Sequence, residues 1–128
     1  MKFRKKIFVI SGSRSDYSLL KPLILKLKKE NNFLTELIIT GSHLEKKFGN
    51  TFKEIIKDKI KINKKIYLNL GKSDKKDIAY STSIGIQKFF KLFNSKKPDG
   101  IIILGDRYEI FSAAYAAFML KIKIFHFA

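Results

Sequence analysis

Residues 8–14 (FVISGSR) and residues 101–107 (IIILGDR) share one pattern. Each is an apolar run of strand length followed by glycine, one small polar or acidic residue and arginine, and each leads into a segment with helical periodicity. A strand that is apolar throughout is typical of a parallel sheet covered on both faces. The two stretches therefore indicate two strand–helix units of one parallel sheet.

Arginine is rare outside these two stretches. Of the 27 lysine and arginine residues, only Arg4, Arg14 and Arg107 are arginine. Lysine suffices for a solvated charge, whereas a planar guanidinium binds a phosphate or carboxylate through two parallel hydrogen bonds. The use of arginine after both strands favours an anion site at the strand ends.

Size and composition restrict the class of protein. The 128 residues fit one domain with a real core, and a hydrophobic fraction of 45% excludes a disordered chain. The chain has no cysteine and two histidines, so we expect no disulfide and no metal site. The apolar run after the basic N-terminus is too short for a signal peptide or a membrane span, so we expect a cytoplasmic protein without a membrane partner.

The net charge of +16 makes a nucleic-acid-binding protein one alternative. The lysines, however, are spread along the chain, mostly on predicted outer helix faces and strand ends. Nucleic-acid patches usually concentrate on one element. We therefore expect a solvated basic surface and no nucleic-acid partner.

Apolar runs alternate with helical patterns along the whole chain. Strands are predicted at residues 6–11, 34–40, 60–70, 100–104 and 122–127, and helices at residues 17–30, 48–57, 77–93 and 108–120, with a loop at residues 41–44. This alternation predicts an α/β fold, a doubly wound, Rossmann-like parallel sheet. In that fold the first and fourth strands lie side by side and ligands bind at the crevice between them, so the two arginine-bearing ends should face each other.

The first turn, residues 12–16 (GSRSD), joins a strand to the start of a helix. Free backbone N–H groups and the helix dipole favour an anion there. The turn matches neither the dinucleotide fingerprint nor the P-loop. The alternative is a tight turn in which Asp16 or Ser18 caps the helix and Arg14 is simply exposed.

The second turn, residues 104–109 (LGDRYE), places Asp106 directly before Arg107 and adds Glu109 two residues later. A carboxylate beside a guanidinium can combine charge recognition with proton transfer. The alternative is that Asp106 caps the next helix while the other two pair at the surface. His43 falls at the same sheet edge, either as a site residue or as a structural histidine.

Taken together, these motifs resemble the hydrolysing UDP-N-acetylglucosamine 2-epimerases of sialic-acid and legionaminic-acid synthesis. The matching segments run in order across nearly the whole chain: residues 12–23 (GSRSDYSLLKPL), 40–44 (TGSHL) with 48–49 (FG), 97–99 (KPD) and 104–109 (LGDRYE). The resemblance implies the N-terminal half of a two-domain fold like that of the GT-B glycosyltransferases. It also implies elimination of UDP to give 2-acetamidoglucal, followed by addition of water to give N-acetylmannosamine.

The resemblance implies roles for individual residues. Asp106 would be a catalytic acid/base, while substrate binding would fall to Gly12, Ser13, Arg14, Asp16, His43, Arg107 and Glu109. Within that set, Arg14 and the Gly12 turn would contact the nucleotide diphosphate or help shape its pocket, whereas His43 and Glu109 would line the sugar side. The expected partner is a UDP-sugar, with no metal or other cofactor, and we expect the full-length enzyme to be a homodimer.

The C-terminal residues depart from the family. The family continues after the last predicted strand with His-x-His-Gly-Gly-Glu, whose glutamate is catalytic, and with a second nucleotide-binding domain. Here residues 126–128 (HFA) stand in place of the first part of that motif. We therefore expect a fragment, an incomplete N-terminal domain with little or no epimerase activity alone. The alternative is a non-catalytic nucleotide-sugar or phosphate-binding module.

Overall fold

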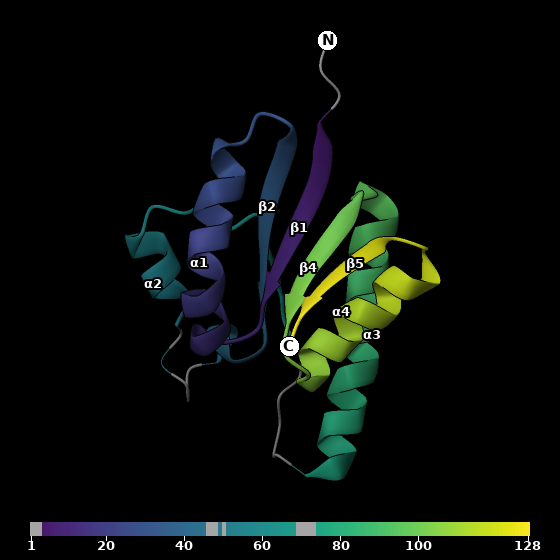
Figure 1. Ribbon diagram of the computed structural model, residues 1–128. Helices are drawn as coiled ribbons and strands as arrows, with labels where there is room; N and C mark the ends of the chain where they lie inside the picture. The colour runs from purple at the N-terminus through teal and green to yellow at the C-terminus, as the bar shows by residue number, and fades with distance from the viewer. Residues whose placement is uncertain (1–3, 46–48, 50, 69–73) are drawn as a thin grey trace.

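A five-stranded parallel sheet lies between two layers of helices (Figure 1). The computed structural model describes residues 4–45, 49, 51–68 and 74–128. The strand order is β3-β2-β1-β4-β5, and every neighbouring pair is parallel. The strands are β1 (Lys5–Ser11), β2 (Phe33–Thr40), β3 (Lys64–Ile66), β4 (Gly100–Leu104) and β5 (Lys123–Phe127).

The helices cover the two faces of the sheet. They are α1 (Arg14–Lys29), the short 3-10 helix η1 (Gly41–Leu44), α2 (Phe52–Lys57), α3 (Lys75–Lys96) and α4 (Tyr108–Met119). Helices α1 and α2 lie on one face, and α3 and α4 lie on the other (Figure 1). This is the doubly wound arrangement predicted from the alternating pattern.

Strand β1 is apolar throughout because it contributes to two cores. Its alternate side chains point to opposite faces of the sheet. Phe8 and Ile10 pack in the core under α3 and α4, whereas Ile7 and Val9 pack in the core under α1. Each core needs its own set of apolar side chains, which explains the continuous run rather than an alternating one.

The strand order reverses between β1 and β4. Residues Ile7 to Val9 of β1 pair with Gly100 to Ile102 of β4, while the other edge of β1 pairs with β2. The prediction that the first and fourth strands are neighbours is therefore confirmed. The carboxyl ends of β1, β2 and β4 all open toward the same edge of the sheet.

Some predicted element boundaries were wrong. Helix α1 begins at Arg14 rather than at residue 17, because the Ser13 side chain accepts a hydrogen bond from the backbone N–H of Asp16 and caps the helix there. Residues 41–44 form a 3-10 helix rather than a loop, and β3 is only three residues long. Helix α2 begins at Phe52; residues 48 and 50 of the predicted helix, and residues 69 and 70 of the predicted third strand, lie outside the described residues.

Helix α4 is held against α3 by a close contact between small residues. A Cβ atom placed on Gly85 of α3 would lie 2.7 Å from the Ser112 Oγ of α4. That hydroxyl lies 3.0 Å from the carbonyl oxygens of both Thr82 and Tyr108, to which it can donate a hydrogen bond. The contact fixes the position of α4, and α4 carries Glu109 in its first turn.

Candidate functional site

The turns after β1 and β2 touch each other at the carboxyl edge of the sheet. The backbone N–H and the hydroxyl of Ser42 donate hydrogen bonds to the carbonyl oxygen of Gly12, at 3.0 and 3.2 Å. Gly41 has a φ of +63°, and a Cβ atom there would lie 2.7 Å from the same oxygen. Only glycine fits at position 41, on grounds of both backbone conformation and space.

Glu109 fills the space between these two turns. It is fully buried, and a Cβ atom on Gly12 would lie 2.9 Å from its Cγ and its Oε1. A Cβ atom on Gly41 would lie 3.1 Å from the same Oε1. Glycine at position 12 is therefore explained by the close approach of Glu109, which comes from α4 on the opposite side of the crevice.

The Arg107 guanidinium is anchored by Glu109. Its Nε donates a hydrogen bond to Glu109 Oε1 at 2.6 Å, and its side chain is 51% exposed. Burial lowers the pKa of Arg107, but the Glu109 carboxylate outweighs this effect and the pKa is raised overall. Because a guanidinium has five N–H donors, the contact through Nε leaves donors on the terminal amino groups for a ligand.

The second carboxylate oxygen of Glu109 is unpaired. Oε2 is buried and has no hydrogen-bond partner within the described part of the chain. A buried carboxylate with one unpaired oxygen depends strongly on its remaining partner, here Arg107. Arg107 therefore supports the fold around Glu109 as well as offering donors to a ligand.

The amino end of α1 is capped by its own residues. Asp16 is 8% exposed, and its Oδ2 accepts a hydrogen bond from the Gly12 N–H at 3.3 Å. Burial raises the pKa of Asp16, against the opposing effects of the Gly12 and Ser13 hydrogen bonds and the Arg107 charge. An anion at this helix end must therefore compete with the Asp16 carboxylate, and the cap is Ser13 rather than Asp16 or Ser18.

Arg14 is paired with an acid on α2. Its Nη2 lies 2.9 Å from Glu54 Oε1 on α2, in an exposed ion pair. The strand ends are adjacent as predicted, and in this structure Arg14 is paired with Glu54 while Arg107 is paired with Glu109.

His43 is enclosed beneath the crevice. One ring nitrogen lies 2.8 Å from Ser11 Oγ and the other lies 2.8 Å from Thr51 Oγ1. Burial lowers the pKa of His43 to about 4, so the ring is neutral at pH 7. This is the structural alternative that the sequence left open, and the ring presents no exposed atom to a sugar in this structure.

Asp106 is the exposed carboxylate of the site. It follows Gly105, whose φ of +81° turns the chain sharply after β4. The N-cap of α4 is Arg107, without a side-chain capping bond, so Asp106 does not cap that helix. Asp106 and Gly105 border a cavity of about 290 Å³ that also includes His126.

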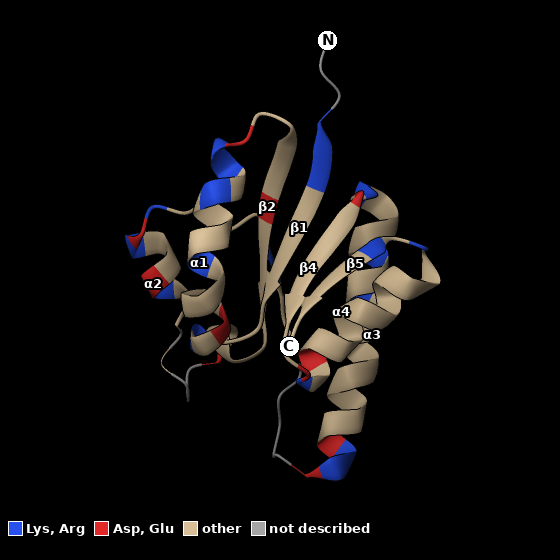
Figure 2. Ribbon diagram, in the orientation of Figure 1, with Lys and Arg blue, Asp and Glu red and all other residues tan. Residues whose placement is uncertain are grey.

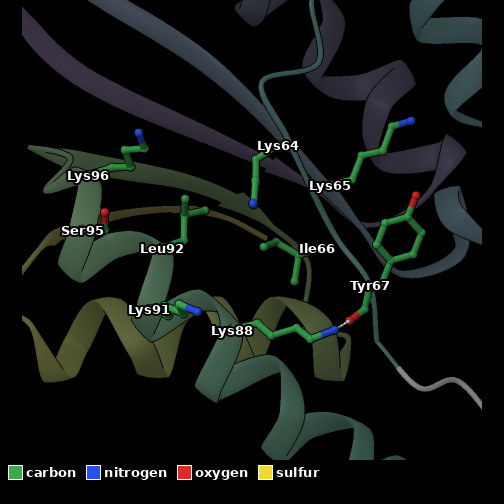
Figure 3. A pocket seen from close by; sticks show the side chains of 9 residues that line it. All are labelled: Lys64, Lys65, Ile66, Tyr67, Lys88, Lys91, Leu92, Ser95 and Lys96. Carbon is green, nitrogen blue, oxygen red and sulfur yellow. Dashed lines mark hydrogen bonds between the residues drawn. The ribbon is translucent and has the colours of Figure 1, made fainter.

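A second cavity was not anticipated from the sequence. It has a volume of about 360 Å³ and lies between β3 and α3 (Figure 3). Its lining includes five lysines: Lys64, Lys65, Lys88, Lys91 and Lys96. None of the predicted site residues lines this cavity.

The basic residues are distributed over several elements. Figure 2 shows lysine and arginine on β1, α1, α2 and both ends of α3, on both sides of the sheet. In the described ranges no group of three or more histidine, aspartate or glutamate residues could hold a metal ion. Across those same ranges no helix combines the length and the apolar character that crossing a membrane requires.

Comparison with known proteins gives a consistent result. The sequence model of the UDP-N-acetylglucosamine 2-epimerase family matches residues 25–128. The GDP/UDP-N,N'-diacetylbacillosamine 2-epimerase (hydrolyzing) of Campylobacter jejuni is 37% identical over 123 residues, covering 96% of this chain and 32% of the relative. Polysialic acid biosynthesis protein P7 of Escherichia coli is 34% identical over 122 residues, which cover 95% of this chain and 31% of that protein.

The fold agrees with the sequence comparison. The crystal structure of UDP-GlcNAc 2-epimerase from Neisseria meningitidis bound to UDP-GlcNAc superposes with a TM-score of 0.78 at 25% identity, covering 94% of this chain and 31% of that chain. The chain thus spans about a third of the length of the relatives that it matches. With a match over most of its length in both sequence and fold, the chain belongs to the UDP-N-acetylglucosamine 2-epimerase family.

Proposed function

We propose that this chain is the N-terminal domain of a hydrolysing UDP-sugar 2-epimerase and that it contacts the UDP-sugar at the adjoining ends of β1 and β4. The Campylobacter jejuni relative is a hydrolysing enzyme, and the Neisseria meningitidis structure holds UDP-GlcNAc. The observation that carries the proposal is the pairing of Arg107 with the buried Glu109, directly beside the exposed Asp106. That arrangement combines a fixed cation with a free carboxylate.

Arg107 is the proposed diphosphate contact. Negative charge grows on the bridging oxygen and the β-phosphate as UDP leaves the sugar. A guanidinium that is already held by Glu109 needs little reorganisation to stabilise this charge. The terminal amino groups of Arg107 can form the two parallel hydrogen bonds that suit a phosphate.

Asp106 is the proposed acid/base. In the elimination step a proton leaves C2 of the sugar and the C1–O bond breaks, which yields 2-acetamidoglucal and UDP. Water then adds across the double bond, placing a hydroxyl on C1 and a proton on the opposite face of C2. An exposed carboxylate beside the leaving group is suited to one of these proton transfers.

The contacts in this domain are too few for tight binding. Two charge-assisted contacts contribute about 3 to 6 kcal/mol together, whereas micromolar affinity needs about 8 kcal/mol. The Ser13 cap of α1 and the Asp16 carboxylate, which accepts a hydrogen bond from the Gly12 N–H, reduce what that helix end can add. We therefore propose weak, saturable UDP binding and little or no turnover by the 128-residue chain.

The test is to incubate the purified chain with UDP-GlcNAc and with UDP-N,N'-diacetylbacillosamine and to measure UDP release. The positive control is the Campylobacter jejuni relative acting on UDP-N,N'-diacetylbacillosamine, the sugar that its name gives. We expect the chain to release UDP at less than about a hundredth of the control rate, a deficit of more than about 2.7 kcal/mol in the barrier. The variant Asp106→Asn should abolish any residual release while leaving UDP affinity unchanged. Turnover close to the control, or residual release unaffected by Asp106→Asn, would refute the proposal.

A further inference from the structure

The cavity of about 360 Å³ between β3 and α3 is lined by cations without an acid among them. Residues 59–68 and residues 78–98 supply its whole lining, and each segment contains four lysines and no aspartate or glutamate. Within the described residues, the ion pairs join Arg14, Lys21 and Arg107 to acids elsewhere in the molecule, so none of them neutralises the lining. An uncompensated positive charge in a concave site concentrates anions there.

Three of the five lysines in the lining surround one apolar floor. The floor is formed by Ile66 of β3, which is 4% exposed, and by Leu92 of α3, which packs against the same core. Around these two side chains lie the ammonium groups of Lys64, Lys88 and Lys91 (Figure 3). The strand and the helix therefore contribute cations from two sides to the same hollow.

The other two lysines are directed away from this floor. Figure 3 shows the side chains of Lys65 and Lys96 pointing outward. Because successive residues of a strand point to opposite faces of the sheet, Lys64 faces α3, whereas Lys65 lies over the Phe52 ring of α2, with its Nζ 4.3 Å from the ring centre. The candidate site thus has three cations rather than five.

The three cations differ in how firmly they are held. Lys88 Nζ donates a hydrogen bond to the carbonyl oxygen of Tyr67, the residue that follows β3. Since an ammonium group has three donors, two remain on Lys88. The ammonium groups of Lys64 and Lys91 have no hydrogen-bond partner within the described part of the chain. Most of the donors around the floor are therefore available to a ligand.

We infer that this cavity binds a small anion that carries three or more negative charges, a polyphosphate or a polycarboxylate. Its volume lies within the range of about 300 to 1,000 Å³ that is typical of small-molecule pockets. A lysine acts as a point charge, which suits phosphate and carboxylate alike. The apolar floor keeps water from one side of the cations and so strengthens their attraction for an anion. The inference goes beyond the proposed function, because no predicted site residue lines this cavity.

A nucleic acid fits this site less well than a small anion. The phosphates of a nucleic acid are spaced along a strand, and proteins bind them with cations that follow the backbone along a groove or a broad surface. Lys64, Lys88 and Lys91 instead surround a single hollow, and the neighbouring Lys65 lies on the opposite face of the sheet. The arrangement favours one compact ligand over an extended one.

The test follows the backbone amide signals of the isotopically labelled 128-residue chain while it is titrated with sodium tripolyphosphate and, separately, with citrate at constant ionic strength. We expect the largest shifts at Ile66, Lys91 and Leu92, with half-saturation by the preferred anion at about 1 mM or below. The anion that binds more tightly identifies the class, phosphate or carboxylate.

A pair of charge-matched variants separates the site from the net charge. Lys64→Gln combined with Lys91→Gln should weaken binding of the preferred anion at least about tenfold. Lys26→Gln combined with Lys29→Gln removes the same charge from exposed positions on α1 and should change the affinity less than about twofold. Circular dichroism checks that both double variants fold. The single variants Lys64→Gln and Lys91→Gln, each expected to weaken binding about threefold, replace the double variant if it does not fold.

Several results would overturn the inference. They are the absence of shifts at the cavity with about 10 mM of either anion, shifts spread over the exposed lysines of every helix, and equal losses in the two charge-matched variants. A short DNA duplex that binds more tightly than tripolyphosphate and shifts the amides of α1 and α3 alike would replace the small-anion site with a nucleic-acid surface. Arg107→Lys should leave the cavity shifts unchanged, so failure of this inference is distinguishable from failure of the proposed function.

Discussion

The turns after β1 and β4 share the order glycine, one residue, arginine, yet their side chains bind different partners. After β1, the Gly12 amide is bonded to Asp16 and Arg14 is paired with Glu54 on a neighbouring helix. After β4, a Cβ on Gly105 would meet nothing within 4 Å, and Arg107 is bonded to a fully buried carboxylate. The first turn is filled by its own side chains, whereas the space beside the Gly105 Cα is empty.

The acid that pairs with an arginine at a strand end determines how firmly the guanidinium is held. An exposed ion pair such as Arg14 with Glu54 contributes about 0 to 1 kcal/mol and holds its guanidinium loosely. A carboxylate with no solvent access, such as Glu109, keeps its partner in place because an unpaired buried charge is costly. We infer that the β4 turn is prepared for an anion while the β1 turn mainly supports the fold.

The largest effect should come from adding a methyl group to the filled turn. Gly12→Ala should lower the free energy of unfolding by about 4 kcal/mol, because the new Cβ displaces Glu109 and disturbs its pair with Arg107. Gly105→Ala should cost only about 1 kcal/mol, since its neighbourhood is open and only the left-handed backbone is strained. Urea unfolding of both variants measures the difference. Equal losses would contradict this difference between the two turns.

The histidine beneath the β1 turn should make stability depend on pH. The pKa of His43 is about 4 in the folded chain against 6.5 ordinarily, so the unfolded chain binds more protons between these values. Stability should therefore rise with pH from about 4 to 6.5, by about 3 kcal/mol, and then level off. Urea unfolding at several pH values measures this slope, and His43→Gln should remove most of it. A wild-type chain without a slope in this window would show that His43 is not enclosed.

Arginine-to-lysine changes should separate the two turns in ligand binding. Arg107→Lys should weaken UDP binding about tenfold, a loss of about 1.4 kcal/mol, because an ammonium group cannot make two parallel hydrogen bonds to phosphate. Arg14→Lys should change the affinity less than about twofold, since that side chain is directed to Glu54. Calorimetric titration gives the affinities, and circular dichroism checks that both variants fold. The reverse order of effects would assign the anion site to the β1 turn.

The smallest effect should come from the surface partner of Arg14. Glu54→Gln should lower the free energy of unfolding by less than about 0.5 kcal/mol and leave UDP affinity unchanged, because the ion pair is solvated. Thermal unfolding at low and high salt measures the contribution. A salt-sensitive loss well above this value would show that the Arg14 pair also holds its turn in place.

Most of the sheet could be predicted from the sequence because its signals are local. Continuous apolar runs such as residues 101–104 require burial on both faces, and right-handed crossovers then place the fourth strand beside the first. The residue at which α1 begins was harder to predict from the sequence. Ser13, Asp16 and Ser18 are all good capping residues, and only the three-dimensional turn selects Ser13.

The partners of the site residues could not be predicted, because they come from distant segments. Nothing near Arg14 in the sequence indicates that it would form an ion pair with Glu54, forty positions later. His43 is enclosed because Ser11 and Thr51 meet on either side of its ring, which depends on the packing of three segments. Glu109 is buried where the two glycine turns approach it closely, and no local pattern in the sequence indicates this burial.

The place where the nucleotide binds can be measured by titrating the isotopically labelled chain with UDP while the NMR signals of its backbone amides are recorded. We predict the largest shifts at Gly105, Asp106 and Arg107, smaller shifts at Gly12, and saturation by about 10 mM UDP, as weak binding requires. Shifts confined to the lysine-lined cavity between β3 and α3, or none at that concentration, would contradict the claim that the nucleotide binds where β1 and β4 end side by side.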